Sequence, residues 1–130
     1  MMNKINKYNA ILSMSFDKKG LKSVSIFDIQ KYINNEFIDL TTEELNEICY
    51  KNKEITLLEY KSEFHKGFSK TFRNENGFTV SEIFDIIEKF EMQSRPLSNW
   101  FDEIDRSHIF FEGFSKIPSK DNTYGIYWGS

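Results

Sequence analysis

The chain begins with the alternation of apolar and polar side chains that is typical of a half-buried strand. Residues 8–16, YNAILSMSF, keep this period of two except at Ile11. The Asp-Lys-Lys-Gly sequence that follows, residues 17–20, predicts a turn. A first strand that ends near Phe16 is therefore expected.

Residues 21–37 allow two interpretations. Val24 and Ile26 alternate with serines, as they would in a returning strand. Alternatively, a helix begins near Ser25, which forms a partial capping arrangement with Asp28. The apolar residues that recur at helical spacing are Ile26, Ile29, Ile33 and Phe37. We favour the helix.

A capping box, in which a Thr at the N-cap is followed three residues later by Glu, predicts the next helix. Thr41 and Glu44 form the box, and the predicted helix spans Leu40 to Lys51. Cys49 lies on its apolar face, where a cysteine acts as a small core residue rather than a nucleophile.

A second capping box, Thr79 and Glu82, begins the strongest predicted helix of the chain. Pro96 disfavours helical backbone at the preceding residue, so the helix should end near Gln93. Its predicted buried stripe consists of Val80, Ile83, Phe84, Ile87 and Phe90.

The remaining apolar stretches predict strands. Residues 54–60 form one, and residues 107–114 and 123–128 form a C-terminal β-hairpin around a loop at 116–122. Residues 61–73 fit either a helix or a strand, since their Phe residues are four positions apart and Gly67 weakens both.

These elements predict one α+β domain over residues 1–130. About three helices should pack on one face of a mainly antiparallel sheet of four or five strands that ends in the hairpin. The predicted core contains Leu12, Met14, Ile29, Ile33, Leu45, Ile48, Leu57, Ile83, Phe84, Ile87, Phe90, Ile109, Phe111 and Ile126.

Length, composition and charge indicate the class of protein and its cellular compartment. A length of 130 residues suits one domain, and 16% aromatic residues argue against disorder. One cysteine, no secretory signal pattern and no long apolar run predict a cytoplasmic protein without a membrane span. The net charge is −3, but residues 82–112 carry eight acidic side chains against three basic ones.

Motifs for chemistry are sparse. The carboxylates and imidazole that could be tested for metal binding are Asp102, Asp105, His108 and Glu112. On a strand, His108 and Glu112 would be ~13 Å apart, too far for one ion. Glycine-rich phosphate loops and zinc or nucleophile motifs do not occur, so we expect no metal and no cofactor.

Two RNA-related functions are the alternative. His65 and His108 could serve as the acid and base of a small ribonuclease. Residues 64–73 interleave Phe with Lys and Arg, as single-strand binding surfaces do. The pI of about 5.4 argues against nucleic acid as the partner.

The sequence therefore favours a non-enzymatic protein-binding module. Aromatic anchors near carboxylates suit a basic protein partner. This composition is typical of small acidic inhibitors, including immunity proteins that neutralise nuclease toxins, although no motif identifies a family. The predicted partner-binding residues are Trp100, Asp102, Glu103, Asp105, Arg106, Glu112, Tyr127 and Trp128.

Overall fold

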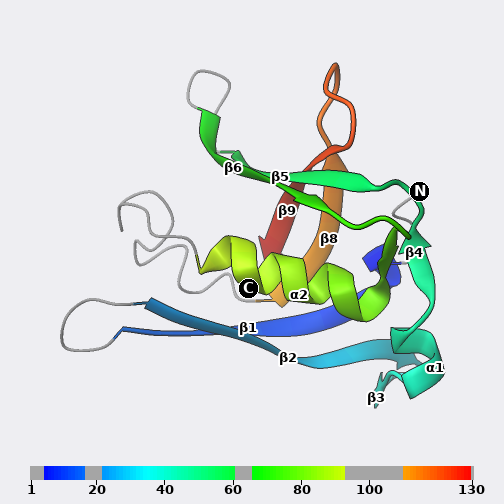
Figure 1. Cartoon of the computed structure of the whole chain (residues 1–130). Helices are drawn as coiled ribbons and strands as arrows, with labels where there is room; N and C mark the ends of the chain where they lie inside the picture. Colours follow the sequence, from blue (N-terminus) through cyan, green and yellow to red (C-terminus); the bar gives the residue numbers. More distant parts are fainter. Residues whose placement is uncertain (1–4, 17–21, 61–65, 93–109, 130) are drawn as a thin grey trace.

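The computed structural model describes residues 5–16, 22–60, 66–92 and 110–129 of the chain (Figure 1). Its elements, in order, are η1 (Ile5–Lys7), β1 (Tyr8–Phe16), β2 (Lys22–Ile33), β3 (Glu36–Asp39), α1 (Thr42–Leu45), β4 (Ile48–Tyr50), β5 (Glu54–Tyr60), β6 (Lys66–Arg73), β7 (Phe78–Thr79), α2 (Val80–Glu91), β8 (Phe110–Lys116) and β9 (Thr123–Gly129).

Seven strands form one mixed sheet in the order β3-β2-β1-β8-β9-β5-β6, and β4 pairs separately with β7. Neighbouring strands are antiparallel except β5 and β9, which are parallel. The predicted architecture is therefore wrong: the sheet is larger, and of the two α-helices described only α2 is substantial.

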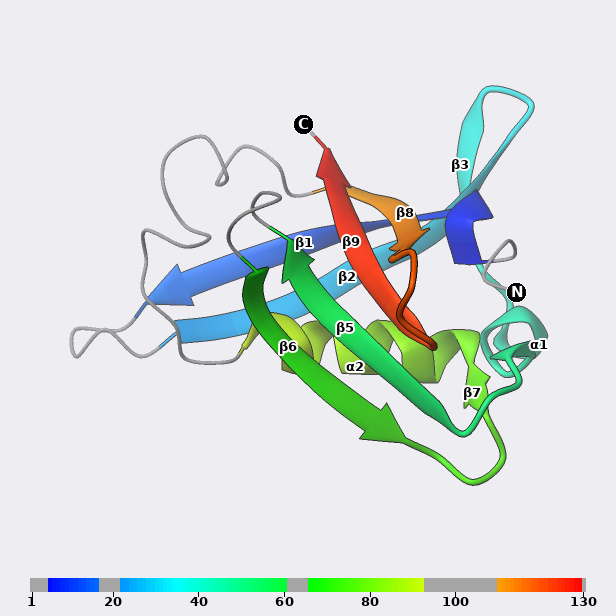
Figure 2. The ribbon, with the colours of Figure 1, turned by 90° about the horizontal axis from the view of Figure 1, so that it is seen from above.

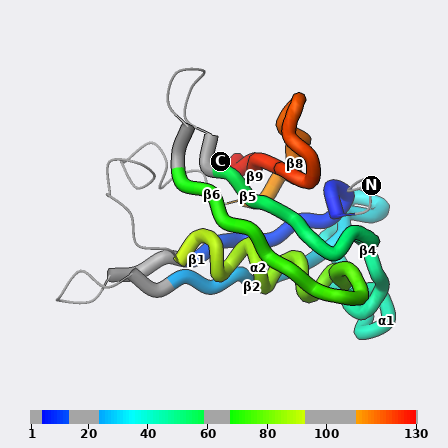
Figure 3. The backbone as a smooth tube through the Cα atoms, turned by 45° about the horizontal axis from the view of Figure 1, so that its top comes forward, coloured from blue at the N-terminus to red at the C-terminus, as the bar shows by residue number. Residues whose placement is uncertain are grey.

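Helix α2 lies on the concave side of the curled sheet, between the β1–β2 hairpin and the β5–β6 hairpin (Figures 1 and 3). Seen from above, β5, β6 and β9 pass over it (Figure 2). We call the sheet face toward α2 the inner face and the opposite face the outer face. Side chains on the inner face pack toward α2, whereas those on the outer face point away from it.

The capping box of α2 was predicted correctly. Thr79 Oγ1 accepts a hydrogen bond from Glu82 N at 3.1 Å, and the Glu82 carboxylate accepts one from Thr79 N at 2.9 Å. The predicted apolar stripe is buried against the inner face. There, the rings of Phe84 and Phe111 pack edge to face, with their centroids 5.3 Å apart. A locally encoded helix thus forms the centre of the core.

The helix predicted from Ser25 is wrong, because these residues form strand β2. Opposite the single residue Ala10, β2 has two residues, Asp28 and Ile29, and Asp28 has a φ of 52°. This bulge shifts the alternation by one position, so that Ile26 and Ile29 both pack against the core. Two inward residues three positions apart imitate the spacing of a helix.

The helix predicted for residues 40–51 begins correctly but ends early. Thr41 and Glu44 form the expected capping box, yet α1 stops at Leu45 and residues 48–50 continue as β4. Cys49 is buried as expected. Ile48, however, is 44% exposed, and it was assigned to the core incorrectly.

The C-terminal hairpin was predicted correctly, with β8 paired to β9. Register shifts between Phe111 and Gly113, which leaves Glu112 as an extra residue on β8. Gly113 has a φ of 120°, and Asn6 holds the next residue, Phe114, by accepting its N–H at 2.9 Å. The bulge therefore lets both Phe111 and Phe114 face the core, although they lie three positions apart.

The core prediction is confirmed at most of its described positions. Leu12, Leu57 and Phe111 are buried with the α2 stripe, and Ile29, Leu45 and Ile126 pack against the core from partly buried positions. Ile33 is 41% exposed, so its assignment to the core was wrong. The Met14 side chain and Ile109 lie outside the described residues. The prediction missed Ile5, Tyr8, Ala10, Val24, Leu40, Tyr50, Ile55, Leu58, Phe78, Ile86, Phe114 and Tyr124.

Candidate protein-binding surface

The outer face of the sheet carries exposed aromatic side chains. Along β1, Tyr8, Ala10 and Leu12 are buried on the inner face, so Ile11 between them must point outward. Ile11 pairs with Phe27 on one side and with Phe110 on the other, which places three apolar residues in a row across three strands. Phe27 and Phe110 are each 44% exposed.

Tyr127 of β9 extends this row. Gly129 pairs with Phe110, and Tyr127 lies two residues before Gly129 in the same strand, so it shares the outer face. Tyr127 is 58% exposed. Gly129 has no side chain of its own, and the Glu112 side chain occupies the place between Tyr127 and Phe110.

A carboxylate lies over this part of the sheet. A Cβ atom at Gly129 would overlap with the side chain of Glu112, so the Glu112 carboxylate covers the outer side of Gly129. The extra residue in β8 makes this possible, because it lets Glu112 leave the regular alternation. We define the outer patch as Ile11, Phe27, Phe110, Glu112 and Tyr127.

The structure brings together two of the eight predicted partner-binding residues, Glu112 and Tyr127. Trp128 instead faces inward and packs edge to face on Phe111, with the ring centroids 6.0 Å apart. The other five, Trp100, Asp102, Glu103, Asp105 and Arg106, lie outside the described residues, as do His65 and His108.

Sequence reasoning missed Phe27 and Phe110 as surface residues. Phe27 was hidden by the helical interpretation of residues 25–37, and the strand alternation of Val24 and Ile26 was the signal that would have placed it outward. Alternation along β8 places Phe110 opposite the predicted core residue Phe111, but its neighbours across the sheet follow only from the pairing with β1.

The basic stretch of residues 64–73 does not present its described rings as an open stacking platform. Phe68 packs on Phe90 of α2 at 5.4 Å, and Phe72 is also partly buried against the core. Lys70 and Arg73 are exposed, and Arg73 pairs with Glu54. Phe68 and Phe72 therefore contribute to the core, whereas Lys70 and Arg73 lie on the surface.

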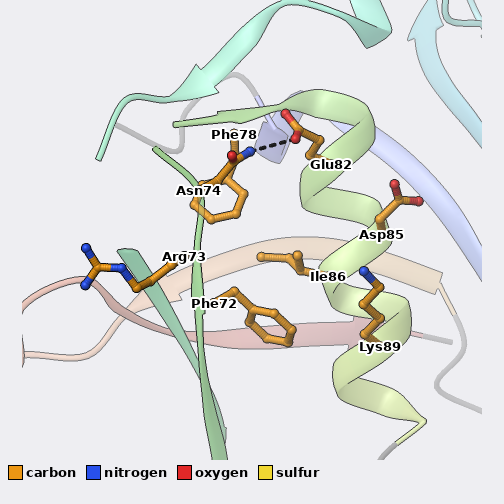
Figure 4. A pocket seen from close by; sticks show the side chains of 8 residues that line it. All are labelled: Phe72, Arg73, Asn74, Phe78, Glu82, Asp85, Ile86 and Lys89. Atoms are coloured by element: carbon orange, nitrogen blue, oxygen red, sulfur yellow. Dashed lines mark hydrogen bonds between the residues drawn. The ribbon is translucent and has the colours of Figure 1, made fainter. Parts of the chain in front are cut away.

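A shallow groove of about 300 Å³ lies between β6 and α2 (Figure 4). Of its charged residues, Glu82 caps α2 and accepts a hydrogen bond from Asn74 at 2.6 Å, and the Arg73 side chain points away from the groove. Its other lining residues are Phe72, Phe78, Asp85, Ile86 and Lys89.

Within the described ranges, no three His, Cys, Asp or Glu side chains are grouped closely enough to hold a metal ion. The candidate ligands Asp102, Asp105 and His108 fall in the segment that the structure does not describe.

Comparison with known proteins does not indicate a function for this chain. No family model, curated protein or solved structure matches the chain. Among the described residues, the helices are too short and too polar to cross a membrane.

Proposed function

We propose that this chain is a non-enzymatic protein-binding module and that the outer patch contacts a basic protein. The observation that carries the proposal is the row of Phe27, Ile11 and Phe110, continued by Tyr127, on a sheet face that no described helix covers. Aromatic residues exposed singly are ordinary, but a contiguous group on one face is characteristic of interaction sites.

Charge favours a basic partner. Glu112 lies within the patch, and Asp28 and Asp39 are exposed on β2 and β3. By their register, the outward positions of β1, β2, β8 and β9 that the structure describes carry no Lys or Arg. A phosphate backbone would be repelled by such a face, whereas Lys and Arg on a protein would be attracted.

The proposal takes the form of an inhibitor or immunity-type protein that neutralises a basic nuclease. A nuclease surface that binds nucleic acid offers cations for phosphates and apolar surface for bases. The outer patch presents a carboxylate and aromatic rings, which could occupy both kinds of subsite.

The experiment starts from protein immobilised on a resin and exposed to native lysate at low salt. A captured basic protein would then be purified and titrated against wild type and three single variants, Phe110→Ser, Tyr127→Ser and Glu112→Gln. Ile48→Ser is the matched control, because Ile48 has the same 44% exposure as Phe110 but lies on the separate β4–β7 sheet.

Loss of either aromatic anchor should weaken binding about tenfold or more, since a central aromatic contributes at least ~1 to 2 kcal/mol. Glu112→Gln should flatten the salt dependence of the affinity, and Ile48→Ser should bind like wild type. A captured protein that binds all four variants equally would refute the patch, and so would capture of nucleic acid in place of protein.

A further inference from the structure

The β2–β3 hairpin exposes apolar side chains on both of its faces. Tyr32 and Phe37 form a cross-strand pair with ring centroids 4.9 Å apart, and they are 54% and 60% exposed. Ile33 and Ile38, on the opposite side, are 41% and 40% exposed. A hairpin of this composition buries little of the apolar surface that it carries.

Strand β3 also ends the sheet. It is the last strand in the sheet order, and all four of its residues, Glu36–Asp39, are exposed. Asn34 and Asn35 form the connecting two-residue turn with φ values of 52° and 66°, the positive values of a type I′ hairpin. The turn makes Ile33 and Glu36 the closing hydrogen-bonded pair.

The register then determines which backbone groups face outward. In an antiparallel pair, bonded and non-bonded residue pairs alternate, so Lys31 and Ile38 bond across the hairpin whereas Phe37 and Asp39 do not. The bond from Leu40 N to Ile29 O, at 3.3 Å, continues this alternation. The N–H and C=O groups of Phe37 and Asp39 therefore point away from β2, toward the open edge.

The two edges of the sheet differ in charge. The opposite edge strand, β6, carries exposed Lys70 and Arg73, and cations on an edge are a common device against unwanted pairing. The β3 edge carries Glu36 and Asp39 and has no cation. Lys31, the cation opposite Ile38, is already bonded to Glu44 at 2.9 Å.

The negative charge of the β3 edge determines which kind of strand can pair with it. Pairing β3 with β3 of a second copy would bring four carboxylates to one seam without a compensating cation, and like charges close together across strands are destabilising. A strand with Lys or Arg opposite Glu36 and Asp39 would instead form favourable pairs, while an apolar residue between them could contact Phe37 and Tyr32.

We propose that β3 is a docking edge for an extended basic segment of another protein, which adds to the sheet as an antiparallel strand. Backbone hydrogen bonds to Phe37 and Asp39 supply the pairing, and Glu36 and Asp39 select for cations. This proposal stands on the hairpin alone and does not require the outer patch to bind a partner.

The test uses a fluorescently labelled peptide with the sequence Thr-Lys-Val-Tyr-Lys-Thr. The protein is titrated into it at low salt, and binding is followed by fluorescence anisotropy. In the antiparallel register its two Lys residues face Asp39 and Glu36. One control peptide has Glu in place of both Lys, and another is methylated on the backbone nitrogen of Tyr, which faces Phe37. Both controls should bind about tenfold or more weakly.

Two protein variants separate charge from backbone pairing. Glu36→Gln combined with Asp39→Asn should weaken binding of the basic peptide about tenfold at low salt and little at high salt, without changing the backbone. Phe37→Pro removes an outward N–H but no hydrogen bond of the hairpin itself. If circular dichroism shows that this proline variant is misfolded, the double variant Glu36→Gln and Asp39→Asn still decides the result.

Hydrogen exchange identifies the edge directly. On addition of the basic peptide, the amides of Phe37 and Asp39 should gain protection, whereas the Ile38 amide, already bonded within the hairpin, should change little. Equal binding of the Glu-substituted peptide would overturn the proposal. So would protection of Phe37 and Asp39 that rises with protein concentration alone, because that result would mean self-pairing.

Discussion

The two capping boxes of this chain allow the stability effect of a cap to be separated from its local geometry. In both, the Thr hydroxyl accepts a hydrogen bond from the Glu backbone N–H at 3.1 Å. Their contexts differ, because α1 has no buried residue whereas α2 has seven, six of them in the hydrophobic core. Thr41→Ala and Thr79→Ala therefore remove the same bond from helices of unequal importance.

We expect Thr79→Ala to lower the free energy of unfolding by about 1 to 2 kcal/mol and Thr41→Ala by about 0.5 kcal/mol. For a domain of this size these losses correspond to melting-temperature shifts of about 4 to 8 °C and about 2 °C. The larger effect arises because fraying at Thr79 exposes Val80 and Ile83, which are fully buried. Calorimetry measures both shifts, and Thr79→Ser, which keeps the hydroxyl, should largely retain wild-type stability.

Glu82 makes the same cap dependent on pH. The Thr79 backbone N–H holds the pKa of the Glu82 carboxyl below its ordinary value of 4.5, with further help from Thr79 Oγ1 and Asn74. The ionised form therefore stabilises the fold fully above that ordinary value, and this contribution is lost as the pH falls through the lowered folded pKa. The difference in unfolding free energy between wild type and Glu82→Gln should shrink between about pH 6 and about pH 3.

Equal melting shifts for Thr41→Ala and Thr79→Ala would refute the reasoning, since the effect of a cap would then be independent of what its helix buries. A difference between wild type and Glu82→Gln that stays constant over the acid range would show that the carboxylate charge does not contribute.

Three further predictions concern the sheet and its contacts. Glu88 accepts a hydrogen bond from a backbone N–H of β2 at 3.2 Å, so Glu88→Ala should lower stability in urea by about 1 to 2 kcal/mol more than Glu88→Gln, which keeps an acceptor. Phe111→Ala should lower the unfolding free energy by about 3 to 5 kcal/mol, whereas Phe110→Ala, one residue earlier and exposed, should lower it by no more than about 1 kcal/mol; similar losses would mean that the assigned strand faces are wrong. Gly113→Ala should lower the melting temperature because of its φ of 120° and a Cβ 2.9 Å from Asn6 Oδ1, while Gly125→Ala, whose Cβ would have only ordinary contacts of 3.8 Å, should be tolerated.

Elements whose signals are short in range were the most predictable. The capping boxes at Thr41 and Thr79, the apolar stripe of α2 and the C-terminal hairpin each depend on residues close together in the chain. The Asn34–Asn35 turn was also readable in this way, as two residues that tolerate positive φ between Ile33 and Glu36, but the helical spacing of residues 26–37 concealed it.

Bulges explain the main errors of strand and surface assignment. The extra residue at Asp28 places Ile26 and Ile29 on the same face, and the extra residue at Glu112 does the same for Phe111 and Phe114. Each bulge depends on how a strand pairs with its neighbour across the hairpin. A periodicity analysis of the strand alone therefore cannot locate it.

The candidate site was predicted only in part. Glu112 and Tyr127 were chosen as acidic and aromatic residues near the end of the chain, and the structure places both on the outer face of the β8–β9 hairpin. Phe27, 100 positions before Tyr127, joins them only because β1 lies between β2 and β8 in the sheet. The row of apolar residues is thus a property of strand order.

The amino-acid sequence by itself determined the α2 helix, its cap, the C-terminal hairpin and the separation of most core residues from polar ones. Those features follow from local hydrogen bonds and from the burial of side chains at a regular period. Only the tertiary structure decided that residues 22–33 are a strand, that β5 lies parallel to β9, and that Phe27, Phe110 and Tyr127 share an uncovered face. The parallel β5–β9 pairing and the shared face depend on contacts between segments far apart in the chain, whereas β2 pairs with its sequence neighbours β1 and β3. The free energy of all these pairings is set by the whole sheet and by the helix that fills its concave side.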